Sequence, residues 1–167
     1  MHDEILVRRA GWLVAKLLFL SLGLVGTARA GEHNLGLPEA AGKAVYTAEC
    51  GSCHIAYPPQ LLSASGWARV IAGLDKHFGV DAGIDTSTAQ TIGGYLRTHA
   101  GAERRFGTSA LRISETPWFR KEHDEVPVSA WKSPQTKSAA NCSACHTQAE
   151  RGDFSERGLR RSALVRP

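Results

Sequence analysis

The sequence predicts a mostly α-helical fold with extensive loops, in one modest domain that follows a short N-terminal leader. In several stretches, apolar residues recur at intervals of three and four, which is the spacing of one face of an α-helix. Proline and glycine bound these stretches, so we expect the helices to be short. The chain has 167 residues with four cysteines and one methionine, and the cysteines fall into two pairs.

Both pairs belong to the motif Cys-x-x-Cys-His, the attachment signature of c-type haem. Its two thiols add to the vinyl groups of one porphyrin, and the histidine ligates the iron. The predicted attachment residues are Cys50, Cys53, Cys142 and Cys145, and the predicted proximal iron ligands are His54 and His146. We therefore predict two covalently bound c-type haems, and no cysteine remains for a disulfide or a nucleophile.

Two alternatives account for the cysteines but not for the histidines. A structural zinc site also uses paired cysteines, but it needs no histidine after each pair, and the spacing between the pairs is far longer than in a zinc ribbon. Two disulfides are the second alternative, although a bridge within Cys-x-x-Cys is usually redox-active. Haem attachment explains both residue types.

Residues 1–30 have the pattern of a secretory signal peptide. Arg8 and Arg9 precede a mostly apolar run, and Ala28-Arg29-Ala30 is a cleavage site of the A-x-A type. The apolar run contains Lys16 and is short for a membrane span, so an uncleaved anchor is the less favoured alternative. We predict cleavage after Ala30 and a periplasmic protein.

The charge of the chain argues against nucleic-acid binding. The leader holds four basic and two acidic residues, so its removal lowers the net charge from +4 to +2. Such a nearly balanced chain lacks the basic surface that nucleic-acid binding requires.

We divide the mature chain into an N-terminal haem-binding half, residues 31–100, and a C-terminal haem-binding half, residues 101–167, in one compact dihaem unit.

Three helices are expected in the N-terminal half. The first extends from Pro38 to Cys53, because proline suits the first helical position. Ser65 is expected to cap the second helix, which ends at Gly79. The apolar stripe of the second helix is Trp67, Val70, Ile71, Leu74, His77 and Phe78. The third helix begins after Asp85, Thr86 or Ser87, and its weaker apolar face is Ala89, Ile92, Leu96 and His99.

In the C-terminal half, residues 100–115 are expected to form a connection with a short extended segment near Ile113. Thr116-Pro117 is a helix cap followed by proline at the first helical position. Phe119 and His123 are four residues apart and so share one face of this helix. Residues 124–140 are expected to be irregular.

The mature chain contains no methionine, because Met1 belongs to the leader. This excludes Met/His ligation, so the sixth ligands are sought among His77, His123, His99 and His33, in decreasing order of preference. His77 ranks first because it ends a strongly amphipathic stretch. The intervals His54–His77 and His123–His146 are equal in length, so local pairing is the simplest, and crossed pairing stays open.

Several segments outside the two motifs resemble the small bacterial dihaem cytochrome c family. These segments are Tyr57-Pro58-Pro59-Gln60-Leu61-Leu62, Trp67, Ile71–Leu74 before His77-Phe78-Gly79, Tyr95-Leu96, Thr116–Phe119 before His123, and Asn141-Cys142. The resemblance implies a cytochrome c-like fold in which the haems form much of the core. It also implies bis-histidine ligation with His77 and His123 as distal ligands. The implied partners are a membrane b-type cytochrome as donor and a small soluble oxygen-binding c-type cytochrome as acceptor.

These expectations describe an electron carrier with no small-molecule substrate and no catalytic residue. The alternative from another class is a haem enzyme, but a dihaem peroxidase needs a longer chain and a haem-thiolate enzyme needs a spare cysteine. A gas-binding sensor is a third possibility. Either alternative requires a haem with one open coordination position.

Overall fold

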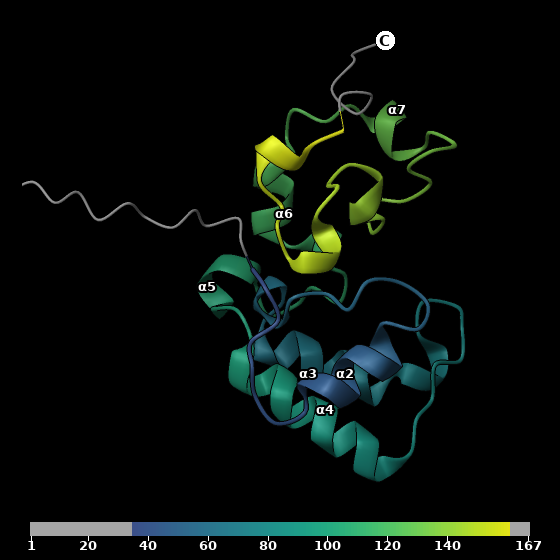
Figure 1. The fold of residues 1–167 in the computed structure, drawn as a ribbon, viewed down its shortest axis with the longest axis vertical. Coiled ribbons are helices and arrows are strands. Elements are labelled where there is room, and N and C mark those ends of the chain that lie inside the picture. Colours follow the sequence, from purple (N-terminus) through teal and green to yellow (C-terminus); the bar gives the residue numbers. More distant parts are fainter. Residues whose placement is uncertain (1–34, 161–167) are drawn as a thin grey trace, which may run out of the picture. The chain divides into compact units, whose positions relative to one another are not determined.

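Helices and 3-10 turns make up the regular structure of residues 35–160, the part of the chain that this computed structural model describes; isolated β-bridges are the only other pairing there. The elements are α2 (Lys43–Cys50), η1 (Pro59–Leu61), α3 (Ala64–Ala72), η2 (Leu74–Lys76), α4 (Thr86–His99), α5 (Glu103–Phe106), η3 (Ile113–Glu115), α6 (Pro117–Glu122), α7 (Val128–Trp131), η4 (Cys142–Ala144), η5 (Ala149–Arg151) and η6 (Glu156–Gly158) (Figure 1). The predicted fold class, mostly helical with long loops, is confirmed.

The predicted leader, with its cleavage site after Ala30, and His33 lie outside the described residues. Within residues 35–160, which belong to one compact unit, no helix is long and apolar enough to cross a membrane.

Helix α4 organises the N-terminal half. It is 14 residues long and packs against both α2 and α3 (Figure 1). Asp85 caps it by accepting hydrogen bonds from the backbone amides of Ser87 and Thr88, so the first of the three predicted caps is correct. Ile92, Tyr95 and Leu96 are its buried residues. Tyr95 was not predicted on the buried face.

Helix α2 is shorter than the sequence suggested. It begins at Lys43 rather than Pro38, because Gly42 has a left-handed backbone with φ of 92°. A side chain at Gly42 would approach the Tyr95 Cβ atom to 2.9 Å. The helix therefore begins just after the backbone's close approach to α4 at Gly42, and it ends at Cys50.

Helix α3 begins earlier and ends sooner than predicted. Its cap is Ser63, whose hydroxyl accepts a hydrogen bond from the Gly66 amide, and not Ser65. The α-helix ends at Ala72, and the chain continues through the 3-10 turn η2 to His77. His77 therefore lies beyond a helical stretch and not within one.

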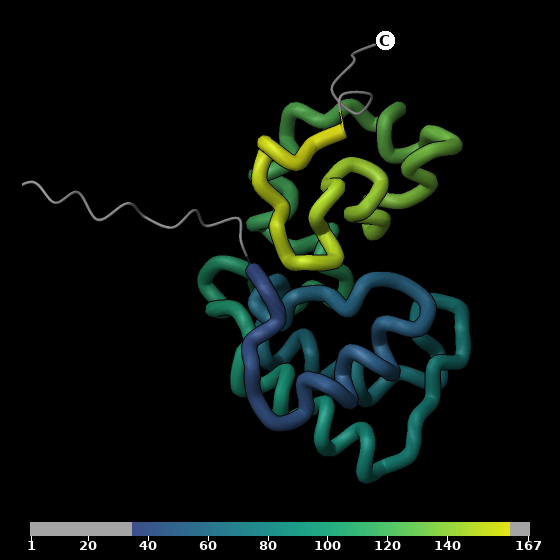
Figure 2. The backbone as a smooth tube through the Cα atoms, in the orientation of Figure 1, coloured from purple at the N-terminus to yellow at the C-terminus, as the bar shows by residue number. Residues whose placement is uncertain are grey.

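The path from α4 to α6 is more regular than expected. Residues 100–115 contain α5 and η3 in place of the predicted extended segment. Figure 2 shows the course of the backbone through this region. Thr116 caps α6 by accepting a hydrogen bond from the Phe119 amide, and Pro117 takes the first helical position. Both features of α6 were predicted. In the irregular stretch that follows, α7 is a single four-residue turn.

The apolar core is distributed unevenly along the chain. Most buried hydrophobic side chains come from the region before α6: Tyr46, Leu61, Leu62, Trp67, Ile92, Tyr95, Leu96, Phe106 and Ala110. From α6 to residue 160, the buried hydrophobic side chains are Phe119 and Ala149. The described segment from α6 onward thus has little apolar interior of its own, as expected for a segment that closes around a large apolar group.

Candidate haem-binding sites

The first motif lies where α2 ends. Cys50 is the last residue of the helix, and Cys53 and His54 follow in the turn beyond it. Gly51 permits this turn, because a side chain there would meet the Thr47 carbonyl oxygen at 2.3 Å. Both thiols and the imidazole are presented from one short segment.

His77 faces His54 in the folded chain. The two imidazole centroids are 6.3 Å apart, and the ring planes differ by 23°. His54 is exposed and His77 is half-buried. The structure thus places the preferred distal candidate opposite the proximal histidine of the first motif.

The second motif has the same arrangement in a different local structure. Cys142 begins the 3-10 turn η4, and Cys145 and His146 follow it. The His123 and His146 centroids are 6.2 Å apart, with ring planes at 82°. His123 directly follows α6 and is half-buried. In both cases the two histidines that lie near each other are also local along the chain, as in the simplest pairing.

These separations would leave room for one metal ion between the two imidazoles of each pair. With a metal–nitrogen bond of about 2 Å and roughly 1.1 Å from the nitrogen to the ring centre, two imidazoles that shared one ion in a straight line would have centroids about 6.2 Å apart. The observed values are 6.3 Å and 6.2 Å. The residues therefore fit two bis-histidine haems, each with two thiols close to one imidazole in the sequence.

Hydrogen bonds at the Nδ1 atoms orient two of the candidate ligands. Nδ1 of His54 lies 2.8 Å from the carbonyl oxygen of Ile55, and Nδ1 of His123 lies 2.9 Å from that of Phe119. Metal-bound histidines commonly donate their second N–H to a carbonyl in this way. Because Nδ1 of each residue takes part in this hydrogen bond, Nε2 is the nitrogen that remains to bind iron.

The electrostatic environment favours neutral imidazoles. Burial lowers the pKa of His77, and the neighbouring His54 and Arg112 lower it further. Burial also lowers the pKa of His123, against opposing effects of the Phe119 carbonyl and Glu122. A neutral imidazole is the form that binds a metal. Both distal candidates are thus in the ligating form at neutral pH.

The four cysteines are free thiols. Burial raises the pKa of Cys50 to about 11 and that of Cys142 to about 11. Neither thiol has the lowered pKa of a reactive nucleophile, so these cysteines do not resemble a catalytic thiolate.

Aromatic side chains surround the imidazoles. Phe119 stacks on His123 at 4.0 Å, as its position four residues earlier predicted, and Trp131 lies 5.7 Å from the same ring. Tyr57 lies 4.8 Å from His54, and Phe154 lies 5.5 Å from His146. Sequence reasoning missed Trp131 and Phe154, because neither lies in a periodic stretch.

His99 has a different neighbour. It is the last residue of α4, and its ring contacts Tyr95 at a centroid distance of 5.0 Å. His99 thus extends the aromatic contacts of α4.

A cleft of about 740 Å³ adjoins both motifs. Its lining includes residues of the first motif, residues of the second motif and the aromatic side chain of Tyr57. Those that belong to the motifs are Gly51, Ser52, Cys53, His54, Cys142 and Ser143. The two attachment segments therefore open onto a common space large enough for a bulky group.

The sequence and structure were compared with known proteins. The sequence model of the family described as dihaem cytochrome c matches residues 46–154, which include both motifs and all four facing histidines. None of the curated proteins that were compared matches the chain.

Solved structures of dihaem cytochromes resemble the chain. A diheme cytochrome type c from Shewanella baltica is 40% identical, with a TM-score of 0.62, over 72% of this chain and 93% of that chain. A diheme cytochrome c from Rhodobacter sphaeroides is 37% identical, with a TM-score of 0.61, over 71% of this chain and 99% of that chain. The family match and these two similarities agree with the two haem-sized sites, and the chain belongs to the dihaem cytochrome c family, whose cofactors are two c-type haems.

Proposed function

We propose that the chain is a periplasmic electron carrier in which His54 with His77, and His123 with His146, are the axial ligands of two low-spin haems. Membership of the dihaem cytochrome c family supports the coarser part of this proposal, a haem protein that carries electrons. The observation that supports the ligand assignment is the pair of centroid separations, 6.3 Å and 6.2 Å.

The haem iron supplies a reversible one-electron couple at each site. The residues around it hold the imidazoles in place through the Nδ1 hydrogen bonds, and they surround them with aromatic rings. With two histidines per iron, no coordination position remains for a substrate. Bis-histidine ligation also favours potentials below those of Met/His cytochromes.

The proposed donor is a membrane b-type cytochrome, and the proposed acceptor is a soluble c-type cytochrome. The predicted signal peptide supports a periplasmic location, because covalent haem attachment takes place after export. An exported carrier meets membrane donors and soluble acceptors in the same compartment. The nearly balanced charge of the mature chain gives no support to a nucleic-acid partner.

Carbon monoxide binding to the reduced protein tests whether each haem iron has two protein ligands. We expect no carbon monoxide difference spectrum and a purely low-spin ferric signal in electron paramagnetic resonance, because all axial positions are filled. Rapid binding of one carbon monoxide per protein would instead support an enzyme or gas sensor with one open haem. Reduction of the purified holoprotein by membranes of the source organism, followed at the haem absorption band, tests the donor separately.

A further inference from the structure

A cation lies beside the distal ligand of the first site. The guanidinium carbon of Arg112 lies 3.9 Å from the ring centroid of Phe78, a cation–π contact. Phe78 is the residue after His77, and the centroids of these two rings are 4.7 Å apart. The Arg112 guanidinium and the His77 imidazole are therefore both neighbours of the same aromatic ring.

The backbone and a carboxylate hold this arrangement. Phe78 has φ of 51°, a left-handed conformation that is uncommon for a bulky residue. The Val80 amide donates a 3.1 Å hydrogen bond to the His77 carbonyl, which closes the turn. On the other side, Nε of Arg112 lies 3.7 Å from a carboxylate oxygen of Glu115. The guanidinium of Arg112 is thus held by two contacts, one with the Phe78 ring and one with the Glu115 carboxylate.

Charged side chains of both signs lie near the second site. Glu122 acts on His123, whose pKa it raises against the effect of burial. Arg160 lies beside the second motif, because its Nε is 3.4 Å from the carbonyl oxygen of Ser143. Its charge helps to lower the pKa of Cys145, against the larger effect of burial. The charges near the second histidine pair therefore favour neither oxidation state by their sign alone.

Charge near a haem shifts its potential in a direction that electrostatics fixes. The oxidised iron carries one more positive charge than the reduced iron, so a nearby cation destabilises the oxidised form and a nearby anion stabilises it. Arg112 is 45% exposed, so solvent screens its effect in part. The sign of the effect is unchanged by screening.

We propose that Arg112 raises the reduction potential of the haem held by His54 and His77. This inference rests on the ligand assignment of the proposed function.

The test replaces Arg112 by Gln and measures both haem potentials in the holoprotein. Haem methyl signals in proton NMR, assigned through contacts to Phe78 for the first haem and Trp131 for the second, follow each haem during a reductive titration. We expect Arg112→Gln to lower the equilibrium constant for reduction of the first haem about threefold to tenfold, or about 28 to 59 mV for one electron. The second haem should not shift.

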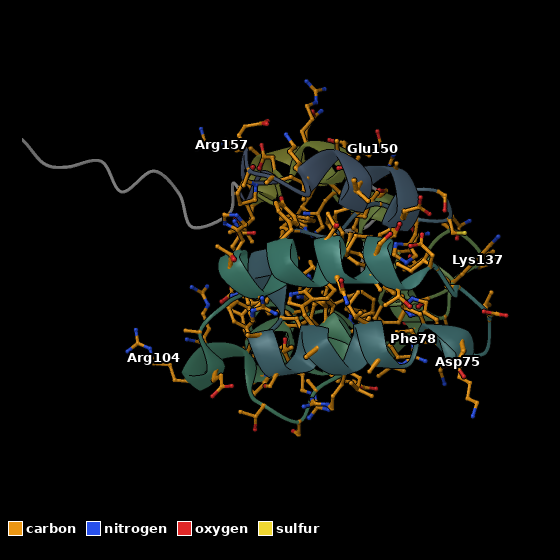
Figure 3. All side chains as sticks on the ribbon, turned by 90° about the horizontal axis from the view of Figure 1, so that it is seen from below. Asp75, Phe78, Arg104, Lys137, Glu150 and Arg157 are labelled. Atoms are coloured by element: carbon orange, nitrogen blue, oxygen red, sulfur yellow. The ribbon has the colours of Figure 1, made fainter. Side chains whose placement is uncertain are left out.

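Three further variants make the result specific. Arg112→Lys keeps the charge without the planar stacking and should recover part of the potential. Glu115→Gln removes the opposing carboxylate and should raise the potential of the first haem. Arg104→Gln is the control for loss of one positive charge, because Arg104 and Phe78 lie at opposite ends of the view in Figure 3. This control should leave both potentials unchanged.

The inference is overturned if Arg112→Gln leaves the first haem unchanged, shifts both haems equally, or shifts them no more than Arg104→Gln. A wild-type first haem that is high-spin would contradict the proposed function itself. A low-spin haem that ignores Arg112 would contradict this inference alone.

Discussion

The hydroxyl of Tyr57 donates a 2.6 Å hydrogen bond to the backbone carbonyl of Ala140, a residue 83 positions later in the chain. The ring of Tyr57 also lies 4.8 Å from the His54 imidazole, and Ala140 is two residues before Cys142. One side chain therefore contacts the proximal histidine of the first site and the segment that leads into the second motif.

Replacing Tyr57 by Phe should weaken this connection without disturbing the ring contact. We expect the free energy of unfolding to fall by about 0.5 to 1.5 kcal/mol, the usual net value of one hydrogen bond. Hydrogen exchange should also become faster at the amides of Asn141 and Cys142. Tyr95→Phe is the matched control, because it removes a hydroxyl bond to the Pro38 carbonyl within the N-terminal half. Faster exchange at Cys142 in both variants would contradict a specific role of Tyr57.

His77→Ala and His123→Ala should each convert one haem from low-spin to high-spin. Each change removes one imidazole of a facing pair, so the iron loses its sixth ligand and binds carbon monoxide when reduced. Electron paramagnetic resonance and the carbon monoxide difference spectrum measure the two effects. His99→Ala should leave both haems low-spin, because His99 contacts Tyr95. A high-spin signal from His99→Ala would reverse the assignment.

Ile92→Ala should be strongly destabilising. The Ile92 side chain is 0% exposed and belongs to the core between α4 and its neighbours. Truncation of a buried isoleucine costs about 2 to 5 kcal/mol through lost burial and the cavity it leaves. Denaturant unfolding of the holoprotein measures this loss. Thr98→Ala on the exposed side of the same helix should change stability by less than about 0.5 kcal/mol.

Thr116→Val should uncap α6 and loosen the approach to His123. The Thr116 side chain is 0% exposed. Its hydroxyl accepts a 3.1 Å hydrogen bond from the Phe119 amide and donates a 2.8 Å hydrogen bond to the Ile113 carbonyl. Loss of a helix cap costs about 0.5 to 2 kcal/mol. Thr116→Ser keeps the hydroxyl and should retain most of the stability. A loss in Thr116→Ser as large as the loss in Thr116→Val would contradict a dominant role of the hydroxyl cap.

The cap of α4 should make stability depend on acidic pH. Hydrogen bonds from Ser87 and Thr88 hold the pKa of Asp85 well below its usual range. A carboxyl with a lowered folded pKa stabilises the fold above its unfolded pKa, and that contribution is lost as pH falls toward the folded pKa. The stability difference between the wild type and Asp85→Asn should therefore shrink below about pH 4. Thermal unfolding of both proteins from pH 7 downward measures the difference, and a constant gap would contradict this role.

The sequence was most informative where chemistry requires a fixed spacing. The two attachment motifs, the cap at Thr116 and the stacking of Phe119 on His123 all follow from local rules, and the structure shows the cap and the stacking. The ranking of His77 and His123 came from periodicity and family resemblance. The structure adds the two centroid distances, which no sequence pattern contains.

The missed features depend on contacts between distant segments. Helix α2 begins later in the chain than predicted because Gly42 passes close to Tyr95. Helix α3 is capped by Ser63, although Ser65 is an equally good cap by residue type. Trp131 reaches His123 from a region whose prolines suggested an irregular loop. The Arg112–Phe78 contact joins residues on separate turns, so periodicity gives no sign of it.

The uneven core described above has a consequence for how the protein is assembled. A chain made from its N-terminus completes the residues of α2, α3 and α4 first, and these already bury one another around Ile92 and Leu96. The segment from α6 onward buries Phe119 and Ala149 as its hydrophobic side chains within the described residues. A newly made chain therefore has a scaffold before it has its second cofactor. We expect the segment from α6 onward to become resistant to proteases when the second haem is loaded, because the haem supplies apolar surface that this segment lacks.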